Sequence, residues 1–186
     1  LKRVKFKPLA WLVTFLMEFI RTTPPLVQIF FIFYAWPMAP FFNVLLDPVP
    51  AGILALGIHF STYISEIYRS GIESVSPGQW EASRALNYSK RQTWVKIILP
   101  QAIPPIIPML GNYLIIMFKE VPLTAAIGIA GMLFVAQFDI GANDFTYVEP
   151  LTITGFLFLA LSYPSALLIN YLERKMNRRF QKSAKS

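Results

Sequence analysis

Residues 76–100 read SPGQWEASRALNYSKRQTWVKIILP, a polar and basic stretch between two long apolar runs. It opens with Ser76, Pro77 and Gln79, which supply a helix cap, a proline at the first helical position and the third residue of a capping box. A short helix should therefore begin near Pro77. It should end just before Asn87, because asparagine tolerates the left-handed backbone that closes many helices.

The same signals return in residues 89–92, where Ser89 and Gln92 hold the capping positions of a second helix. This helix should run through Trp94 towards the next apolar run, which Pro100 introduces. The product is a helix-turn-helix over residues 77–98. The small residues make the first helix narrow enough to enter a groove, and the tryptophans offer apolar anchors. The helix pair is therefore suited to binding another protein.

The composition of the whole chain indicates a membrane protein. Of its 186 residues, 55% are hydrophobic and 15% are aromatic, and the mean hydropathy is +0.50. A helix needs roughly 20 apolar residues to cross a bilayer. Five windows lack any Asp, Glu, Lys or Arg, namely 22–46, 48–65, 97–118, 121–138 and 150–172. At least three of these windows are long enough to cross.

The distribution of charge gives the orientation. Fifteen of the 17 Lys and Arg residues lie in three blocks, at 1–8, 69–96 and 174–186. The segments 37–50 and 120–150 contain acids and neither Lys nor Arg. By the positive-inside rule the three basic blocks are cytoplasmic. The basic tail is expected to be a solvated flank rather than a dedicated lipid site.

We therefore predict an all-α fold, a polytopic helical membrane bundle with both ends of the chain in the cytoplasm. The predicted crossings are 9–36, 51–72, 98–118 and 151–172, with 121–138 as a re-entrant or interfacial helix that is rich in small residues. The chain forms one domain over 1–186, with a cytoplasmic coupling loop at about 74–100 and a basic tail at 174–186. Because Leu1 is not an initiator Met, we expect the sequence to begin inside a longer protein.

The first crossing is irregular. Glu18 and Arg21 interrupt it and stand three apart on one helical face, so they can form an ion pair that lowers the cost of lying near lipid. Residues 22–25 read Thr-Thr-Pro-Pro, which removes two backbone donors and disfavours helix before each proline. We expect a break or kink there. The four prolines at 100, 104, 105 and 108 should likewise unwind the entry of the third crossing.

Polar side chains within the apolar runs are candidates for a solute path, because an unpaired polar group in lipid is costly. The candidates are His59, Ser61, Thr62, Asn112, Lys119 and Glu120. His59 is expected to be a neutral ring bonded between helices rather than a titrating switch. Lys119 and Glu120 could bind a zwitterionic solute, and snorkelling to the outer surface explains them equally well.

Several other functions fit poorly. The chain has no Cys and one His, so no metal site and no catalytic residue is proposed, and His59 with Ser61 or Ser65 is too little for a hydrolase. A DNA-binding helix-turn-helix needs a small folded domain around it, whereas this pair runs directly into apolar spans, so no nucleic acid is expected. A secondary transporter or channel subunit remains the alternative, although acids other than Glu18 are missing from the middles of the spans.

The spacing of the central stretch resembles a known family. Glu81, Ala82 and Ser83 are followed after three residues by Asn87, and after nine more by Ile97, Leu99 and Pro100. This pattern resembles the EAA signature of permease subunits of bacterial ABC importers. Such permeases usually have one more crossing before the basic block seen here at 1–8, so the resemblance implies a further crossing before Leu1. Residues 18–24, 26–28, 66–72, 78–82 and 99–112 resemble the polar amino-acid uptake branch. The family usually has Ala at position 83 and Gly at position 87. Both replacements are small or tolerate the left-handed conformation, so the turn should survive.

The resemblance implies a mechanism with several partners. A second permease subunit would complete the path, as a homodimer or a heterodimer, two ATP-binding subunits would lie beneath, and an external binding protein would deliver the solute. Because the chain has no phosphate-binding Gly-rich loop, ATP and Mg would be bound by the partner and no cofactor by this chain. The docking residues would be Glu81, Ala82, Ser83, Arg84, Ala85, Leu86 and Asn87. A polar amino acid is the leading solute, and a compatible solute such as ectoine is the alternative.

Overall fold

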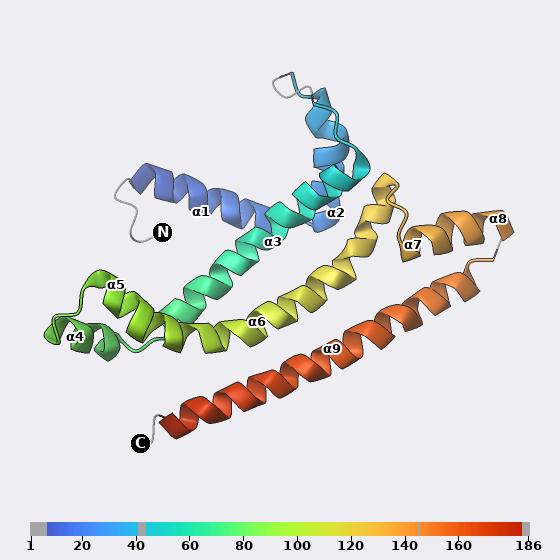
Figure 1. Ribbon diagram of the computed structural model, residues 1–186. Coiled ribbons are helices and arrows are strands. Elements are labelled where there is room, and N and C mark those ends of the chain that lie inside the picture. The colour runs from blue at the N-terminus through green and yellow to red at the C-terminus, as the bar shows by residue number, and fades with distance from the viewer. Residues whose placement is uncertain (1–6, 41–43, 145, 184–186) are drawn as a thin grey trace. The chain divides into compact units, whose positions relative to one another are not determined.

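The computed structural model describes residues 7–40, 44–144 and 146–183, and the rest of the basic block at 1–8 and of the tail lies outside them. Every regular element in these ranges is helical, which confirms the all-α prediction (Figure 1). The elements are α1 (Lys7–Thr22), α2 (Pro25–Phe30), η1 (Phe31–Ala35), η2 (Trp36–Met38), α3 (Pro48–Glu73), α4 (Pro77–Ala85), α5 (Lys90–Gln92), η3 (Thr93–Ile98), α6 (Leu99–Glu120), η4 (Val121–Ile127), α7 (Met132–Phe134), η5 (Val135–Gly141), α8 (Ala142–Asp144) and α9 (Val148–Ser183).

The contacts divide the chain into two compact units. The first combines residues 1–63 with 119–158, and the second combines 64–118 with 159–186. The long helices α3, α6 and α9 each pass from one unit into the other. The prediction of a single domain over the whole chain therefore stays a prediction.

Among the described residues, two helices are long and apolar enough to cross a membrane, Lys90–Ile127 and Val148–Met176. A third is added if α1 and the helix that follows it form one bent span. At 1.5 Å per residue, α3 is about 39 Å long. It is not among the helices that are apolar enough to cross, because polar side chains lower its hydropathy. The predicted total of four crossings therefore stays a prediction.

The predicted break after α1 is confirmed. The helices Lys7–Thr22 and Pro25–Met38 meet at an angle of 108°, so residues 9–36 do not form one straight helix. Pro24 is extended, with ψ of 137°, and Pro25 begins the second helix. The two prolines act as the sequence predicts, because each removes a backbone donor and restricts the residue before it.

The segment 121–138 is not a helix of crossing length. The helix that carries the third apolar run continues past residue 118 to Ile127 and ends at Gly128, whose φ is +84°. A further apolar helix follows over Met132–Gly141. The segment packs closely on α3 at Gly52, where an added Cβ would lie 3.1 Å from Ile129 and 3.3 Å from Thr124.

The core of the first unit is built where α2, α3 and η4 meet. Ile29, Ala51, Ala55 and Ile127 are all at most 4% exposed and form one cluster. Ile29 comes from the segment directly after the break, so the broken helix is anchored to α3 by apolar packing as well as by polar contacts.

The expectation that prolines unwind the third apolar run is wrong. Pro104, Pro105 and Pro108 lie inside the continuous α-helix α6. The turns just before it, η3 (Thr93–Ile98), are wider π-helical turns, and Figure 1 shows α6 as a curved rod. The curvature of α6 accommodates the missing donors and the bulk of the proline rings without a break.

In the second unit, α3 and α6 pack tightly at a glycine. A Cβ added to Gly71 would lie 2.2 Å from Cγ1 of Ile106 and 3.1 Å from the Ala102 carbonyl oxygen. Ile106 is buried beside Ile67, Ile98 and Ala102. A second close approach joins α6 to α9, where Gly111 faces Ile169. A side chain at Gly71 or Gly111 would fit only if the neighbouring isoleucine moved.

Candidate functional site

The first limb of the helix-turn-helix is α4, which begins at Pro77 as predicted. Ser76 has the extended conformation of a capping residue, with φ of −51° and ψ of 135°, but its side chain makes no capping hydrogen bond. Its carbonyl instead accepts from the Gln79 amide at 3.0 Å. Proline suits the first helical position, because an amide at that position would have no helical partner to bond.

The turn closes at Asn87, whose φ of 54° is the only left-handed value among the described residues other than glycine. The Asn87 amide donates to the Arg84 carbonyl and the Tyr88 amide to the Ser83 carbonyl, each at 3.0 Å. These two bonds form a Schellman motif, which satisfies the last carbonyls of α4. The predicted end of the first helix is confirmed.

The second limb begins with a complete capping box. The Gln92 amide donates to Ser89 Oγ at 3.3 Å, and the Ser89 amide donates to Gln92 Oε1 at 2.9 Å. This limb does not stop at Pro100, because α5, η3 and α6 form one uninterrupted helix from Lys90. A force on the turn would therefore act directly on a helix that is long and apolar enough to cross the membrane.

The two limbs are held together by an aromatic pair. The rings of Trp80 and Trp94 meet edge to face with centroids 5.2 Å apart. Ser83 is 1% exposed and Thr93 is 8% exposed, so both lie between the limbs. The Ser83 hydroxyl donates to the Trp80 carbonyl at 2.8 Å. Position 83, which the sequence placed among the docking residues, packs inside the hairpin.

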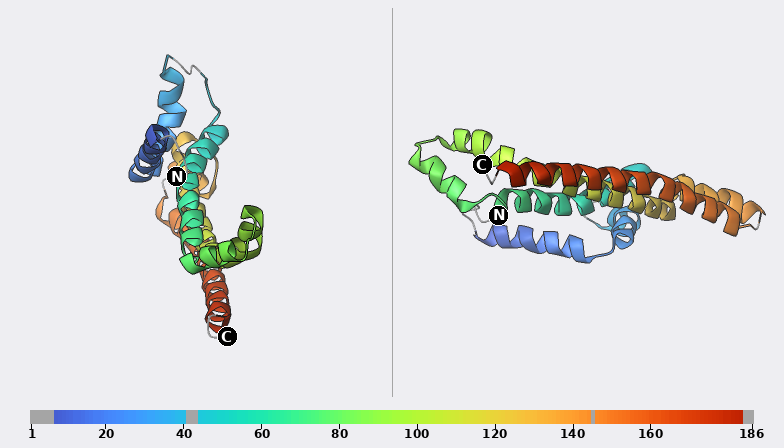
Figure 2. Two further views of the ribbon diagram at one scale, coloured as in Figure 1. Left: turned by 90° about the vertical axis from the view of Figure 1, so that its left-hand side faces the viewer. Right: turned by 90° about the horizontal axis from the view of Figure 1, so that it is seen from below.

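The remaining predicted docking residues lie on the surface of the hairpin. Glu81, Ala82, Arg84, Ala85, Leu86 and Asn87 are all exposed. Leu86 is 65% exposed although it is a large apolar side chain at the tip of the turn. Figure 2 shows the two limbs, α4 and α5 (green), folded back on one another. The site is a rigid hairpin formed by α4, α5 and η3. It presents an acid, Glu81, an apolar tip, Leu86, and several cations, including Arg84, Lys90 and Arg91.

The path candidates have diverse surroundings. His59 and Thr62 are buried, whereas Ser61, Asn112 and Lys119 are exposed and Glu120 is half-buried. His59 Nδ1 lies 3.3 Å from Gln28 Oε1 on α2, which agrees with the expected ring between helices. Glu120 lies near His59, and its Oε2 is buried with no hydrogen-bond partner among the described residues.

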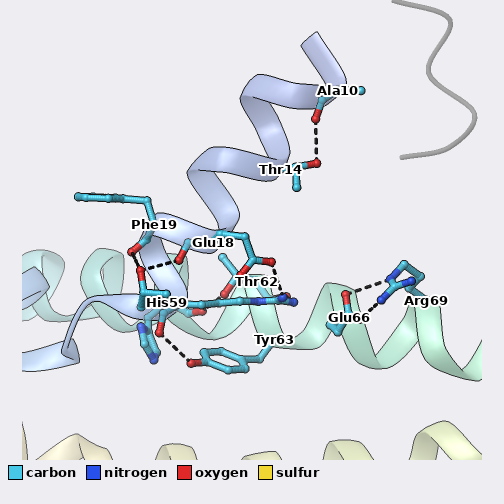
Figure 3. Close-up of polar contacts among 11 residues, drawn as sticks. Ala10, Thr14, Glu18, Phe19, His59, Thr62, Tyr63, Glu66 and Arg69 are labelled. Carbon is cyan, nitrogen blue, oxygen red and sulfur yellow. Dashed lines mark hydrogen bonds and ion pairs between the residues drawn. The ribbon is translucent and has the colours of Figure 1, made fainter. Parts of the chain in front are cut away.

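The predicted ion pair is present, and it is part of a larger polar cluster (Figure 3). Arg21 Nη1 lies 3.2 Å from Glu18 Oε1, whose side chain is 59% exposed. Arg21 also donates from Nη2 to the Thr62 carbonyl at 2.9 Å and lies over the Tyr63 ring, 5.6 Å from its centroid. Arg21 thus fastens the end of α1 to α3, which its spacing from Glu18 alone could not reveal.

Sequence reasoning missed Gln28. Its Nε2 lies 2.6 Å from the Ile20 carbonyl, 3.0 Å from the Thr23 carbonyl and 2.7 Å from Thr23 Oγ1. The signal was available: two successive prolines leave two carbonyls without amide donors, and an amide side chain lies three residues further along. Within the described residues no group of three His, Cys, Asp or Glu could hold a metal ion.

The sequence matches one protein family over most of its length. The family described as "Binding-protein-dependent transport system inner membrane component" covers residues 2–178. A probable amino-acid ABC transporter permease of Sinorhizobium fredii is 38% identical over 96% of this chain and 76% of its own length. The L-cystine transport system permease of Bacillus subtilis is 36% identical over 94% of this chain and 73% of its own length.

Two solved structures are similar. One, titled "Crystal structure of an amino acid ABC transporter with histidines", has a TM-score of 0.84 and 34% identity, and the match covers 94% of this chain and 79% of the other. An inward-facing structure of the MetNI methionine ABC transporter has a TM-score of 0.67 at 20% identity, over 90% and 76% of the two chains. The second likeness concerns the fold alone.

Proposed function

The chain belongs to the family of inner membrane components of binding-protein-dependent transport systems, and from this premise we propose that it is the permease subunit of an ATP-driven amino-acid importer. In this proposal it carries a polar or zwitterionic solute into the cytoplasm by alternating access. It carries out no chemistry itself. ATP and Mg are bound by a separate ATPase subunit that docks on the hairpin formed by α4, α5 and η3.

The observation that carries the proposal is the structure of the hairpin, which is exposed, rigid and continuous with α6. Six of the seven predicted docking residues are exposed, and the seventh, Ser83, is buried. The Trp80 and Trp94 pair and the Schellman turn make the hairpin rigid, and its second limb continues into α6. A rigid projection continuous with a membrane helix is suited to receive a partner and to transmit its movement.

The chemistry of the exposed face suggests what the partner offers. Glu81 would meet a cation in a cleft of the ATPase, and Leu86 would enter an apolar pocket. Arg84, Lys90 and Arg91 are exposed around the turn, so acidic groups would line the rim of that cleft. Displacement of the hairpin would tilt α3 and α6. Linkage requires that solute delivery outside changes nucleotide handling inside by the same coupling free energy.

The proposed solute is an amino acid. The similar permeases are named for amino acids in general, L-cystine, glutamine and arginine. Ectoine, which is also zwitterionic, remains the alternative. The proposed path residues are His59, Ser61, Thr62, Asn112, Lys119 and Glu120. The buried Oε2 of Glu120, which lacks a partner among the described residues, suits an ammonium group, and Lys119 suits a carboxylate.

The remaining proposed partners follow from this role. A second permease subunit, identical or related, would complete the path, and two ATP-binding subunits and an external binding protein would complete the importer. Both ends of this chain would be cytoplasmic, on the same side as the hairpin.

The test of this proposal is reconstitution with the candidate partners. The ATPase subunit should co-purify with the full-length permease, and vesicles holding the complex with its binding protein should take up a polar amino acid only with ATP inside. Vanadate, which traps the ATPase, should abolish that uptake. Uptake that continues with vanadate, or that follows an ion gradient without ATP, would instead identify a secondary transporter.

A further inference from the structure

The break between α1 and α2 leaves two backbone carbonyls without their helical donors. In a continuous helix the amides of residues 24 and 25 would bond the carbonyls of Ile20 and Arg21, but both residues are proline. Side chains replace them. Gln28 Nε2 donates to the Ile20 carbonyl at 2.6 Å, and the Tyr63 hydroxyl donates to the Arg21 carbonyl at 3.3 Å. Both orphan carbonyls are therefore paired.

These contacts fix the orientation of the Gln28 amide. Its nitrogen end faces the carbonyls of Ile20 and Thr23, which can only accept. Thr23 Oγ1 must also accept from it, because the Thr23 hydroxyl proton is directed to the Phe19 or Ile20 carbonyl. A flipped amide would place an oxygen against these acceptors. Oxygen Oε1 of Gln28 is thus the atom that faces His59.

The orientation of the amide decides which nitrogen of His59 carries the proton. Gln28 Oε1 lies 3.3 Å from His59 Nδ1, and an amide oxygen can only accept, so Nδ1 must be the donor. In the neutral ring, Nε2 is then left as an acceptor. Any group that binds there must therefore be a donor, such as an ammonium or a hydroxyl.

We propose that Gln28 is a positioning residue: its amide closes the broken helix, holds it on α3 and fixes the proton of the neutral His59 imidazole on Nδ1. In free histidine the proton prefers Nε2, so the assignment is not the default. The inference goes beyond the proposed transport function and does not depend on it, because its readout is the state of the ring and needs no ATPase.

The first experiment determines directly which nitrogen of the His59 ring carries the proton. Full-length permease carrying ¹⁵N- and ¹³C-labelled histidine, in lipid vesicles with any partner subunits unlabelled, is studied by solid-state NMR at about pH 8.5, about two units above the ordinary histidine pKa. The His59 signals are those lost in His59→Gln. We expect Nδ1 to be the protonated nitrogen and Nε2 the bare one. A proton on Nε2 in the wild-type protein would overturn the proposal.

Two variants separate the two parts of the role. The Ile20 carbonyl also accepts from the His59 ring, and Gln28 Nε2 holds that carbonyl in place. Gln28→Leu removes the side-chain acceptor and this support together, so the Nδ1–H signal should be lost in favour of Nε2–H. Gln28→Glu keeps an acceptor for Nδ1, so that signal should remain, but its carboxylate cannot donate to the Ile20 and Thr23 carbonyls. In a Val27→Cys background, a spin label on α2 should then become more mobile in both variants.

Gln137→Leu provides the matched control, because Gln137 is an exposed glutamine on η5. This variant should change neither the histidine signals nor the mobility of the spin label at position 27. A tautomer that is unchanged in Gln28→Leu would refute the positioning of His59. A spin label that stays equally immobile in Gln28→Glu would refute the closure of the break.

Discussion

Glu81→Lys should leave the permease folded and inserted in the membrane, yet reduce ATP-driven uptake at least tenfold. Glu81 is exposed on α4 and has no ion-pair partner among the described residues, so its replacement costs the hairpin little. In the docked complex, a lysine would leave the partner's cation unpaired and face it with a like charge. Losing one side of such a pair costs about 2–5 kcal/mol, and each 1.4 kcal/mol is about tenfold in an equilibrium constant.

The measurements for this prediction are uptake into vesicles and ATP hydrolysis by the complex, with and without solute and binding protein. Hydrolysis should continue at its basal rate but should no longer respond to solute. Glu149→Lys is the control, since it makes the same charge change at an exposed position on α9, which is not part of the hairpin. Full uptake by Glu81→Lys would show that Glu81 does not dock.

Gly71→Ala should destabilise the second unit by about 1–3 kcal/mol, the usual cost of overpacking a core. The new methyl group would lie 2.2 Å from Ile106 Cγ1, which is not the free end of that side chain, and 3.1 Å from a backbone oxygen. The measurement is the thermal unfolding transition of the purified subunit in detergent, with the yield of folded protein from the membrane.

Two further variants test that explanation. Ile106→Ala removes the atoms that collide, so the double variant Gly71→Ala with Ile106→Ala should lose less stability than the sum of its two single variants. Gly57→Ala lies on the same helix with nothing within 4 Å of the added carbon, and it should be neutral or slightly stabilising. Equal stability of Gly71→Ala and Gly57→Ala would contradict the close contact between α3 and α6.

The parts of the fold that the sequence predicted depend on local signals. The start of α4 at Pro77, the left-handed Asn87 and the capping box at Ser89 each follow from a few neighbouring residues whose backbone preferences agree. The break at the two prolines of residues 24 and 25 is of the same kind. Such features are set before any distant contact forms, so they can be inferred from sequence alone.

The features that the sequence did not predict depend on side-chain contacts and helix geometry that no local signal specifies. Ser83 looked like a docking residue, but the opposite limb of the hairpin buries it. The prolines of α6 do not unwind the helix, because its curvature accommodates them. Gln28 and Tyr63 reach the carbonyls at the break from outside α1, and Tyr63 lies 42 residues from its partner.

The most direct test of the account is the side of the membrane on which the hairpin lies. The chain has no cysteine, so Leu86→Cys places a single exposed thiol in it, at the tip of the turn. A membrane-impermeant maleimide should label the permease in inside-out vesicles and fail to label it in right-side-out vesicles. Labelling from the outside would contradict the account, because an ATPase in the cytoplasm could not then reach the hairpin.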